Sequence, residues 1–288
     1  MKPTKLIELY NKKIVIEFYE DKHWYIRTDI GRIITSVSGV TGLVGSPDIL
    51  MAWAIKLTRN HLIDIIESGN LIRTDDIYTA CGLYREKRDT AGNIGTAVHN
   101  WIDCYIKSKI SKGKEIKLPT DEKILNGVIA FKTWESENKV KFIQSEKIVY
   151  MAWYESKFFC ETGERDYITL PQYLKLTKKQ QKDFDLAIDY VGTLDLKAIV
   201  NGKMTLVDHK TGNYLSDTVP FQVSAYLEAD RMETGTDYEE RMILHIKKDT
   251  GDFKVVNLGM ENHDKDFQAF KGLLIAKNRL KEKGGGKK

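Results

Sequence analysis

Apolar and polar residues alternate most regularly between residues 189 and 212, on both sides of the dipeptide Asn201-Gly202. Asn-Gly between two alternating runs predicts a β-hairpin with a two-residue turn, because both central residues of a type I′ turn need positive φ. This turn pairs Val200 with Lys203 and fixes the register of the two strands. Counting back from the turn then places an aspartate of the first strand opposite an aspartate of the second.

The two aspartates are Asp195 and Asp208. Side chains alternate between the faces of a strand, so we expect both acids and Lys210 to share one face, with Leu194 and Leu196 on the other. Like charges directly opposite each other destabilise a sheet. The repulsion could be offset by a raised pKa of one acid, by a salt bridge from a neighbouring lysine, or by a divalent cation that binds both carboxylates.

Periodicity also predicts the elements on either side of this hairpin. Residues 13–28 alternate like a hairpin that turns near residues 21 and 22, and residues 46–66 form a helix with Ser46 as N-cap and Pro47 in the first turn. The other expected elements are helices over about 90–108, 121–137, 216–232 and 262–282, a strand over 141–153 and a hairpin over 240–259.

From residue 90 onward the order of helices and strands predicts an α/β fold with a mixed central sheet flanked by helices. We expect residues 1–89 to form an accessory segment, a β-hairpin and helical extension packed on a core of residues 90–282. Within that core, residues 155–188 are rich in Lys and Gln and too polar to be buried, so we expect an inserted surface loop with a short helix. Residues 283–288 are expected to be a flexible tail.

Composition narrows the class of protein without naming a partner. The chain has 288 residues, 42% hydrophobic and 30% charged, as in ordinary soluble globular proteins. The net charge of +4 permits binding to a polyanion but does not predict it. The three cysteines form no CxxC pair, so we expect a reducing, cytoplasmic compartment. We expect neither a membrane segment nor a signal peptide, because no sufficiently long apolar run occurs.

Two carboxylates and a lysine on one strand face would suit a metal-dependent hydrolase. Asp195 and Asp208 could hold a cation that stabilises charge on a phosphodiester oxygen, while Lys210 orients or deprotonates the attacking water. The alternative is an ordinary surface salt bridge, because Asp-x-Lys is common by chance. His99, with Asp103 one helical turn later, is either a metal ligand oriented by that carboxylate or a half-buried structural histidine.

Residues outside the hairpin offer further polar groups. Glu146, on the preceding strand, is a possible additional acid, although Lys147 and Lys141 offer it ordinary surface ion pairs. Gln222 and Tyr226 are four residues apart on an expected helix, so an amide and a phenol share one face. These two groups could hydrogen-bond phosphate or sugar, and the ring could stack on an unpaired base.

Taken in order, five motifs resemble the RecB-type branch of the PD-(D/E)XK nuclease superfamily: "GTAVH" (95–99), "SEKIV" (145–149), "GTLD" (192–195), "VDHKTG" (207–212) and "QVSAY" (222–226). The resemblance covers roughly residues 90–250. The upstream stretches "SVSGVTGLV" and "SPDILMAWAIK" are similar to the segment before this core in phage nucleases and in the mitochondrial genome-maintenance exonuclease. The first acidic motif lacks proline and the second acid is Asp rather than Glu, and the superfamily allows both departures.

The resemblance implies a restriction-endonuclease-like αβββαβ core that binds one or two Mg²⁺ or Mn²⁺ ions. The implied ligands are His99, Asp195 and Asp208, together with the backbone carbonyl of His209. Glu146 is implied to lie near the metal or its water. The four cysteines of the iron–sulfur members are missing from this chain, so we expect no iron–sulfur cluster.

The resemblance also implies Lys210 as the catalytic lysine, and Gln222, Tyr226 and Thr211 as residues that shape the site or contact DNA. The implied activity is hydrolysis of DNA phosphodiester bonds, as an exonuclease in replication, recombination or repair, in a phage or a bacterium. Two rivals stay open. One is a structure- or sequence-specific endonuclease, and the other is a non-catalytic nucleic-acid-binding module with the same fold.

Overall fold

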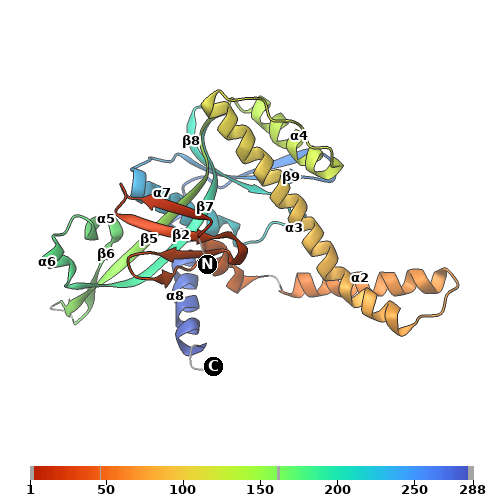
Figure 1. Cartoon of the computed structure of the whole chain (residues 1–288), viewed down its shortest axis with the longest axis horizontal. Helices are drawn as coiled ribbons and strands as arrows, with labels where there is room; N and C mark the ends of the chain where they lie inside the picture. Colours follow the sequence, from red (N-terminus) through yellow and green to blue (C-terminus); the bar gives the residue numbers. More distant parts are fainter. Residues whose placement is uncertain (1–2, 46, 161–162, 285–288) are drawn as a thin grey trace.

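The computed structural model describes residues 3–45, 47–160 and 163–284, which form two β-sheets and the helices around them (Figure 1). The N-terminal sheet is antiparallel, in the order β1-β2-β3-β4. Its strands are β1 (Lys5–Leu9), β2 (Ile14–Tyr19), β3 (Trp24–Arg27) and β4 (Arg32–Ile33). The expected hairpin is confirmed as β2 and β3, joined by the short helix η1 (Glu20–Lys22). The sequence pattern missed the two flanking strands.

The central sheet has six strands in the order β10-β9-β8-β7-β5-β6. Only β8 and β9 run parallel, so the sheet is mixed, as expected. Its strands are β5 (Lys141–Phe159), β6 (Arg165–Thr169), β7 (Phe184–Val200), β8 (Lys203–Lys210), β9 (Glu240–Lys247) and β10 (Asp252–Asn257). The turn between β7 and β8 is confirmed, because Val200 pairs with Lys203 and Asn201 and Gly202 have φ of 50° and 89°.

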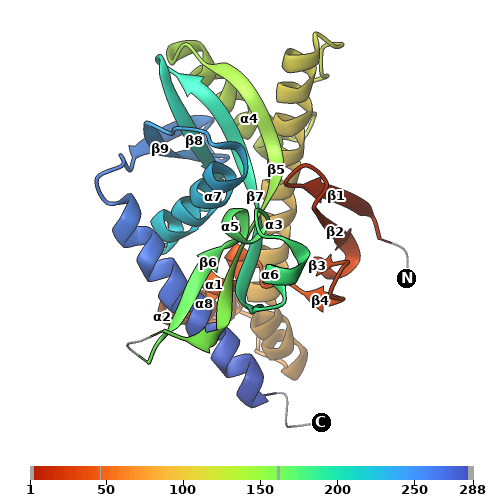
Figure 2. The same cartoon turned by 90° about the vertical axis from the view of Figure 1, so that its left-hand side faces the viewer.

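Helices cover both faces of the central sheet, which establishes the α/β class (Figure 2). One apolar core lies beneath α3 (Thr74–Ser111) and α4 (Glu122–Glu137). Another lies beneath α1 (Val37–Thr41), α7 (Val219–Thr234) and α8 (His263–Gly284), and a third joins the N-terminal sheet to β5 and β7. The expected tail begins within α8, and residues 285–288 lie outside the described residues.

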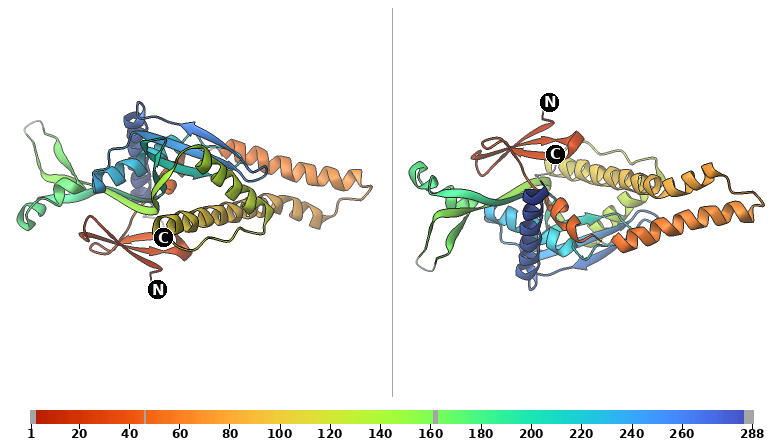
Figure 3. Two further views of the ribbon diagram at one scale, coloured as in Figure 1. Left: turned by 90° about the horizontal axis from the view of Figure 1, so that it is seen from above. Right: turned by 90° about the horizontal axis from the view of Figure 1, so that it is seen from below.

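A two-helix arm projects from this body, formed by α2 (Pro47–Glu67) and the first half of α3 (Figures 1 and 3). Helix α2 begins at Pro47 as expected, while the predicted N-cap Ser46 lies outside the described residues. Helix α3 begins at Thr74 rather than near residue 90, so the expected boundary at residue 89 falls within one continuous helix. Among the described residues, no single helix is long and apolar enough to span a membrane. One bent pair, α1 with the following η2 (Gly42–Val44) and then α2, reaches the length and apolar composition of a membrane span.

The expected surface loop over residues 155–188 is largely strand, although the segment does lie at the surface and does contain short helices. Strands β5 and β7 extend into this region and pair with each other, and β6 adds to their edge, opposite the arm (Figure 3). The short helices α5 (Leu170–Tyr173) and α6 (Lys178–Gln181) follow, and Leu170 is fully buried. The charged residues lie on the exposed side, while backbone pairing and a few apolar side chains hold the segment on the sheet. Amino-acid composition alone could not reveal the backbone pairing or these apolar contacts.

Candidate metal centre

The alternation of side chains along β7 breaks at Asp195. Leu194 packs in the core beneath α7 and α8, whereas Leu196 packs beneath α3 and α4. On β5, Glu146 has φ of +46°, which is unusual for a residue with a side chain. The β5–β7 ladder pairs the residues on both sides of Glu146 and Asp195 but skips these two. The prediction that Leu194 and Leu196 share a face is therefore wrong, and the break turns both carboxylates toward α3.

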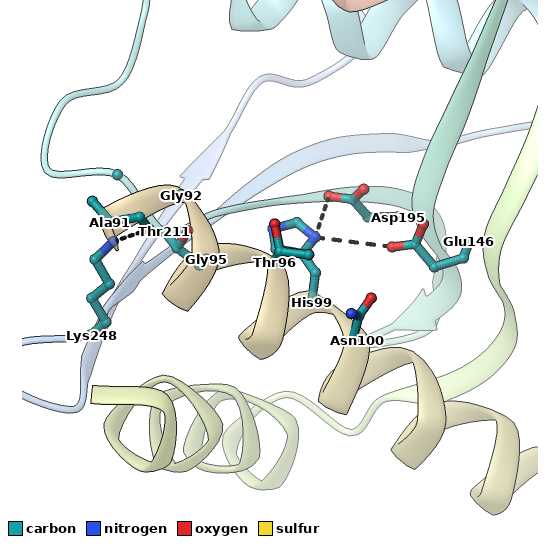
Figure 4. A pocket seen from close by; sticks show the side chains of 11 residues that line it. Ala91, Gly92, Gly95, Thr96, His99, Asn100, Glu146, Asp195, Thr211 and Lys248 are labelled. Atoms are coloured by element: carbon teal, nitrogen blue, oxygen red, sulfur yellow. Dashed lines mark hydrogen bonds and ion pairs between the residues drawn. The ribbon is translucent and has the colours of Figure 1, made fainter. Parts of the chain in front are cut away.

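His99 on α3 faces the two carboxylates (Figure 4). Its Nδ1 lies 3.9 Å from Asp195 Oδ2 and 4.0 Å from Glu146 Oε1. One turn earlier, Gly95 lets the helix approach the end of β8, because a Cβ at that position would lie 2.7 Å from Thr211 Oγ1. The glycine of the "GTAVH" motif thus brings the histidine of the same motif to the sheet.

His209 adds a second imidazole to this group. Its backbone N–H donates to Asp195 Oδ2 at 2.7 Å, and its ring lies 5.8 Å from the ring of His99 and 5.5 Å from that of Phe131, centre to centre. Side-chain ligand atoms of His99, Asp195 and His209 lie within 4.8 Å of one another, close to the spacing that a shared metal ion would impose. The sequence analysis gave His209 only a backbone role.

The ring of His209 is buried without a hydrogen bond to any part of the chain that the structure describes. Only 2% of the residue is exposed, and its Nε2 is one of the buried polar atoms without a partner. Burial, with His99 nearby, lowers the pKa of His209 to about 3, so the imidazole is neutral at physiological pH. An unsatisfied buried polar atom costs about 1–3 kcal/mol, and a neutral imidazole is a common metal ligand.

Asp208 and Lys210 form an adjoining group on the other side of β8. Lys210 Nζ lies 2.6 Å from Asp208 Oδ2, and Asp208 is almost fully buried. Burial and the nearby Asp195 raise the pKa of Asp208, although Lys210 opposes the shift. Burial acts to lower the pKa of Lys210, but the two aspartates raise it overall, so the lysine stays charged. The acids and Lys210 therefore make two adjoining groups rather than the single one that strict alternation predicts.

Glu146 lacks the lysine partners that its neighbours in the sequence suggested. Burial, Asp195 and Asp103 raise the pKa of Glu146 to about 8. Lys147, expected to pair with it, instead reaches Asp230 Oδ1 at 2.6 Å. Asp103, expected to orient His99, accepts hydrogen bonds from Lys107 and Ser145 instead. The carboxyl of Glu146 is therefore held protonated near neutral pH in the metal-free protein.

Two cavities give access to these groups. A cavity of about 550 Å³ is lined by residues that include His99, Glu146, Asp195 and Thr211 (Figure 4). Lys210 lines a separate one of about 250 Å³, together with residues from α1, from the loop after β8 and from α7. Of the predicted site residues, His99, Glu146, Asp195 and Thr211 line the first cavity, and Lys210 and Gln222 line the second.

Gln222 and Tyr226 lie beside the second cavity. Gln222 Nε2 donates to Tyr226 Oη at 2.7 Å, and Gln222 lines the cavity with Lys210. Tyr226 is only 5% exposed and packs on Gly192, where a Cβ would lie 2.3 Å from the ring. The buried ring of Tyr226 packs against the sheet, which agrees with the site-shaping role and leaves little of the ring exposed for stacking on a base.

Sequence reasoning also missed Lys248, after β9. Its Nζ donates to the backbone carbonyl of Ala91 at 3.0 Å and lines the cavity that holds His99 (Figure 4). Nothing in the turn sequence around Lys248 signals this position. The ring of His209 did have a signal, because alternation places it on the face of β8 opposite Asp208, toward the helix that carries His99.

The side chains around the larger cavity fit a divalent cation. They offer two imidazoles and a carboxylate close to ligand spacing, with a second carboxylate beside them. His209 brings a buried ring without a partner, which a bound ion would satisfy. Carboxylate and imidazole together suit divalent metals.

Comparisons with known proteins add little to this geometry. No protein-family model matches the chain, and no curated protein matches it. Among solved structures, one titled "Crystal structure of SSO0001" is similar over 55% of this chain, with 11% sequence identity and a TM-score of 0.27. The match spans 62% of that protein. A likeness this weak carries no argument about fold or function.

Proposed function

We propose that this protein is a metal-dependent deoxyribonuclease with a PD-(D/E)XK core of the RecB type. The observation that carries the proposal is the convergence of Asp195, Glu146 and His99 beside an open cavity, with the Asp208–Lys210 ion pair on the adjoining strand. The order α3, β5, β7, β8, α7, β9 supports the expected αβββαβ arrangement, with α4 added after α3 and with β6, α5 and α6 in the inserted segment.

The glycines of two motifs support the same reading. Gly95 and Gly192 both lie where a Cβ would collide with a side chain of a neighbouring element, Thr211 in one case and Tyr226 in the other. A glycine needed for close approach is a structural reason for the motif. The motifs that suggested the resemblance are thus tied to the geometry of the candidate site.

Each side chain has a chemical task in the proposed reaction. A bound divalent cation would supply positive charge at the scissile phosphate and acidify a bound water. Asp195 and His99 would hold the cation, and Glu146, with a pKa near neutrality, can accept or release a proton at the cavity. Lys210 is kept charged by Asp208, so it would stabilise anionic oxygens by hydrogen bonding rather than remove a proton.

A nuclease assay with two pairs of matched variants tests the proposal. With Mn²⁺ and end-labelled single- and double-stranded DNA, Asp195→Asn and Lys210→Ala should each lower the cleavage rate by at least about 100-fold. The controls are Asp185→Asn and Lys203→Ala, the same residue types on the same strands. Both control side chains are mostly exposed and form surface ion pairs, so their loss should leave the rate unchanged.

Cleavage by Lys210→Ala or Asp195→Asn at the wild-type rate would exclude the proposed mechanism. Absence of cleavage by the wild-type protein on every DNA substrate would instead favour the non-catalytic binding module. Closed circular DNA separates the remaining alternatives, because an exonuclease leaves it intact and an endonuclease opens it.

A further inference from the structure

We propose that the imidazole of His209 is itself a metal ligand and that, with His99 and Asp195, it makes this site select a transition-metal ion over Mg²⁺. The inference rests on the metal site of the proposed function and specifies its cation. It assigns to the side chain of His209 a role that the sequence motif gave only to its backbone carbonyl. It concerns binding, so it can be tested without any cleavage.

The three side chains already stand close to the spacing that one ion would impose. Two ligands that each bind an ion at about 2.1 Å can be no more than about 4.2 Å apart. His99 Nδ1 and Asp195 Oδ2 lie 3.9 Å apart, and the ligand atoms of all three residues lie within 4.8 Å of one another. Small rotations of the side chains therefore suffice to bring all three onto one ion.

The ring of His209 is fixed in place yet lacks a polar partner. Its edge-to-face contacts with His99 and Phe131 hold the ring, and its N–H to Asp195 ties the backbone to the same carboxylate. Within the described ranges the ring makes no hydrogen bond, although the residue is only 2% exposed. Another buried histidine, His263, has Glu228 within 3.4 Å of its Nε2. The ligand atoms of His99 and Asp195 lie within 4.8 Å of a ring nitrogen of His209.

The donor set decides which ion fits. Mg²⁺ binds oxygen ligands, keeps several waters and is seldom held by imidazole. Two imidazoles with a carboxylate suit first-row transition metals such as Fe²⁺, Co²⁺ or Zn²⁺, among which Mn²⁺ is the weakest binder and so gives the most stringent test against Mg²⁺. Without the ring of His209 the site would offer one imidazole and nearby carboxylates, a set that discriminates less between Mg²⁺ and Mn²⁺. His209 is thus the residue that would set the preference.

Calorimetric titration of the full-length, metal-free protein with Mn²⁺ and with Mg²⁺, in the absence of DNA, tests the inference. The wild-type protein should bind Mn²⁺ at least about tenfold more tightly than Mg²⁺. His209→Asn should weaken Mn²⁺ binding by about 10–100-fold and change Mg²⁺ binding by less than about threefold. The control is His263→Asn, which removes a buried histidine far from the cluster and should leave both affinities unchanged.

A spectroscopic measurement keeps the test decisive if His209→Asn fails to fold. In the wild-type Mn²⁺ complex, electron spin-echo modulation should report two coordinated imidazole nitrogens. One coordinated imidazole or none, or a Mn²⁺ affinity unchanged in a folded His209→Asn protein, would overturn the inference. A protein that binds Mn²⁺ through two histidines yet cleaves no DNA would uphold it and contradict the proposed nuclease. Cleavage of DNA by a protein that binds Mn²⁺ through only one imidazole would support the proposed nuclease and overturn the inference about His209.

Discussion

Asp230 and Asp208 are both buried carboxylates packed at the same sheet, yet their surroundings differ. Asp230 accepts hydrogen bonds from Lys147 at 2.6 Å, Lys197 at 2.8 Å and Tyr238 at 2.7 Å. Burial opposes ionisation of Asp230, but the two lysines outweigh it and lower its pKa. Asp208 has one lysine for a partner, and its pKa is raised. Both side chains are almost inaccessible to solvent, yet their pKa values shift in opposite directions, because Asp230 has more cationic and hydrogen-bonding partners while Asp208 has Asp195 beside it.

The difference separates a structural cluster from a candidate functional one. Around Asp230 the positive and negative groups are matched, and the carboxylate needs no further ligand. Beside Asp208, the acids Asp195 and Glu146 and the ring of His209 outnumber their partners, and burial together with Asp195 raises the pKa of Glu146 to about 8. Unpaired charge and unsatisfied polar atoms near a cavity are typical of binding and catalytic sites. The excess of ligands is what a divalent cation would satisfy.

The largest expected effect on stability comes from breaking the matched cluster. Asp230→Asn should lower the free energy of unfolding by about 3–5 kcal/mol, because it leaves the buried charge of Lys197 uncompensated and Lys147 with Glu233 as its remaining acidic partner. Glu146→Gln should instead raise it at pH 7, by about 1–2 kcal/mol, because the unfolded chain gains free energy by ionising this carboxyl and the folded chain does not. Urea unfolding of both metal-free variants measures the contrast. If the two substitutions destabilised the protein equally, the contrast between a charge-matched cluster at Asp230 and an unmatched one at Glu146 would be wrong.

A bound cation should change stability only through the second cluster. Mn²⁺ at 100 times its dissociation constant should raise the free energy of unfolding of the wild-type protein by about 2.7 kcal/mol. Asp195→Asn should lose most of this gain, while the exposed Asp185→Asn should keep it. Thermal unfolding with and without Mn²⁺ measures both. The idea fails if Asp195→Asn is stabilised by Mn²⁺ as strongly as the wild-type protein.

The smallest expected effect is a difference in pH dependence, measured in EDTA. The pKa of Glu146 is raised in the folded chain, so its stabilising contribution is present below the ordinary carboxyl pKa and is lost as the pH rises toward 8. The pKa of Asp230 is lowered, so its contribution is present above the ordinary value and is lost as the pH falls through the lowered one. Glu146→Gln should therefore flatten the decline between about pH 5 and about pH 8. An unchanged decline in that variant would show that another group causes it.

The sequence predicted the hairpin of β7 and β8 because its turn is encoded locally. Asn201 and Gly202 suit the positive φ that the turn requires, and the register followed from it as far as Leu196 opposite Val207. The next residue, Asp195, departs from strict alternation. That departure depends on β5, a strand far away in the sequence, so local patterning could not show it.

The sequence predicted which residues form the candidate site, but not which acids the neighbouring lysines pair with. His99, Asp195 and Glu146 meet at one cavity, as the motifs suggested. Lysine pairing was not predictable, because Lys147 and Lys197 reach Asp230, an acid on a helix that lies distant in the sequence. The sequence could not decide whether Tyr226 shapes the site or contacts DNA, since only the packed structure reveals the contact of its ring with Gly192.

The central claim is that the irregular pairing at Glu146 and Asp195 creates a cation site with two histidines. The most direct measurement is anomalous diffraction from crystals of the full-length protein soaked in Mn²⁺. We expect one strong peak within about 2.3 Å of ligand atoms of His99, Asp195 and His209. A protein that takes up no Mn²⁺ at this position, or that binds it with the ring of His209 turned away, would contradict the account.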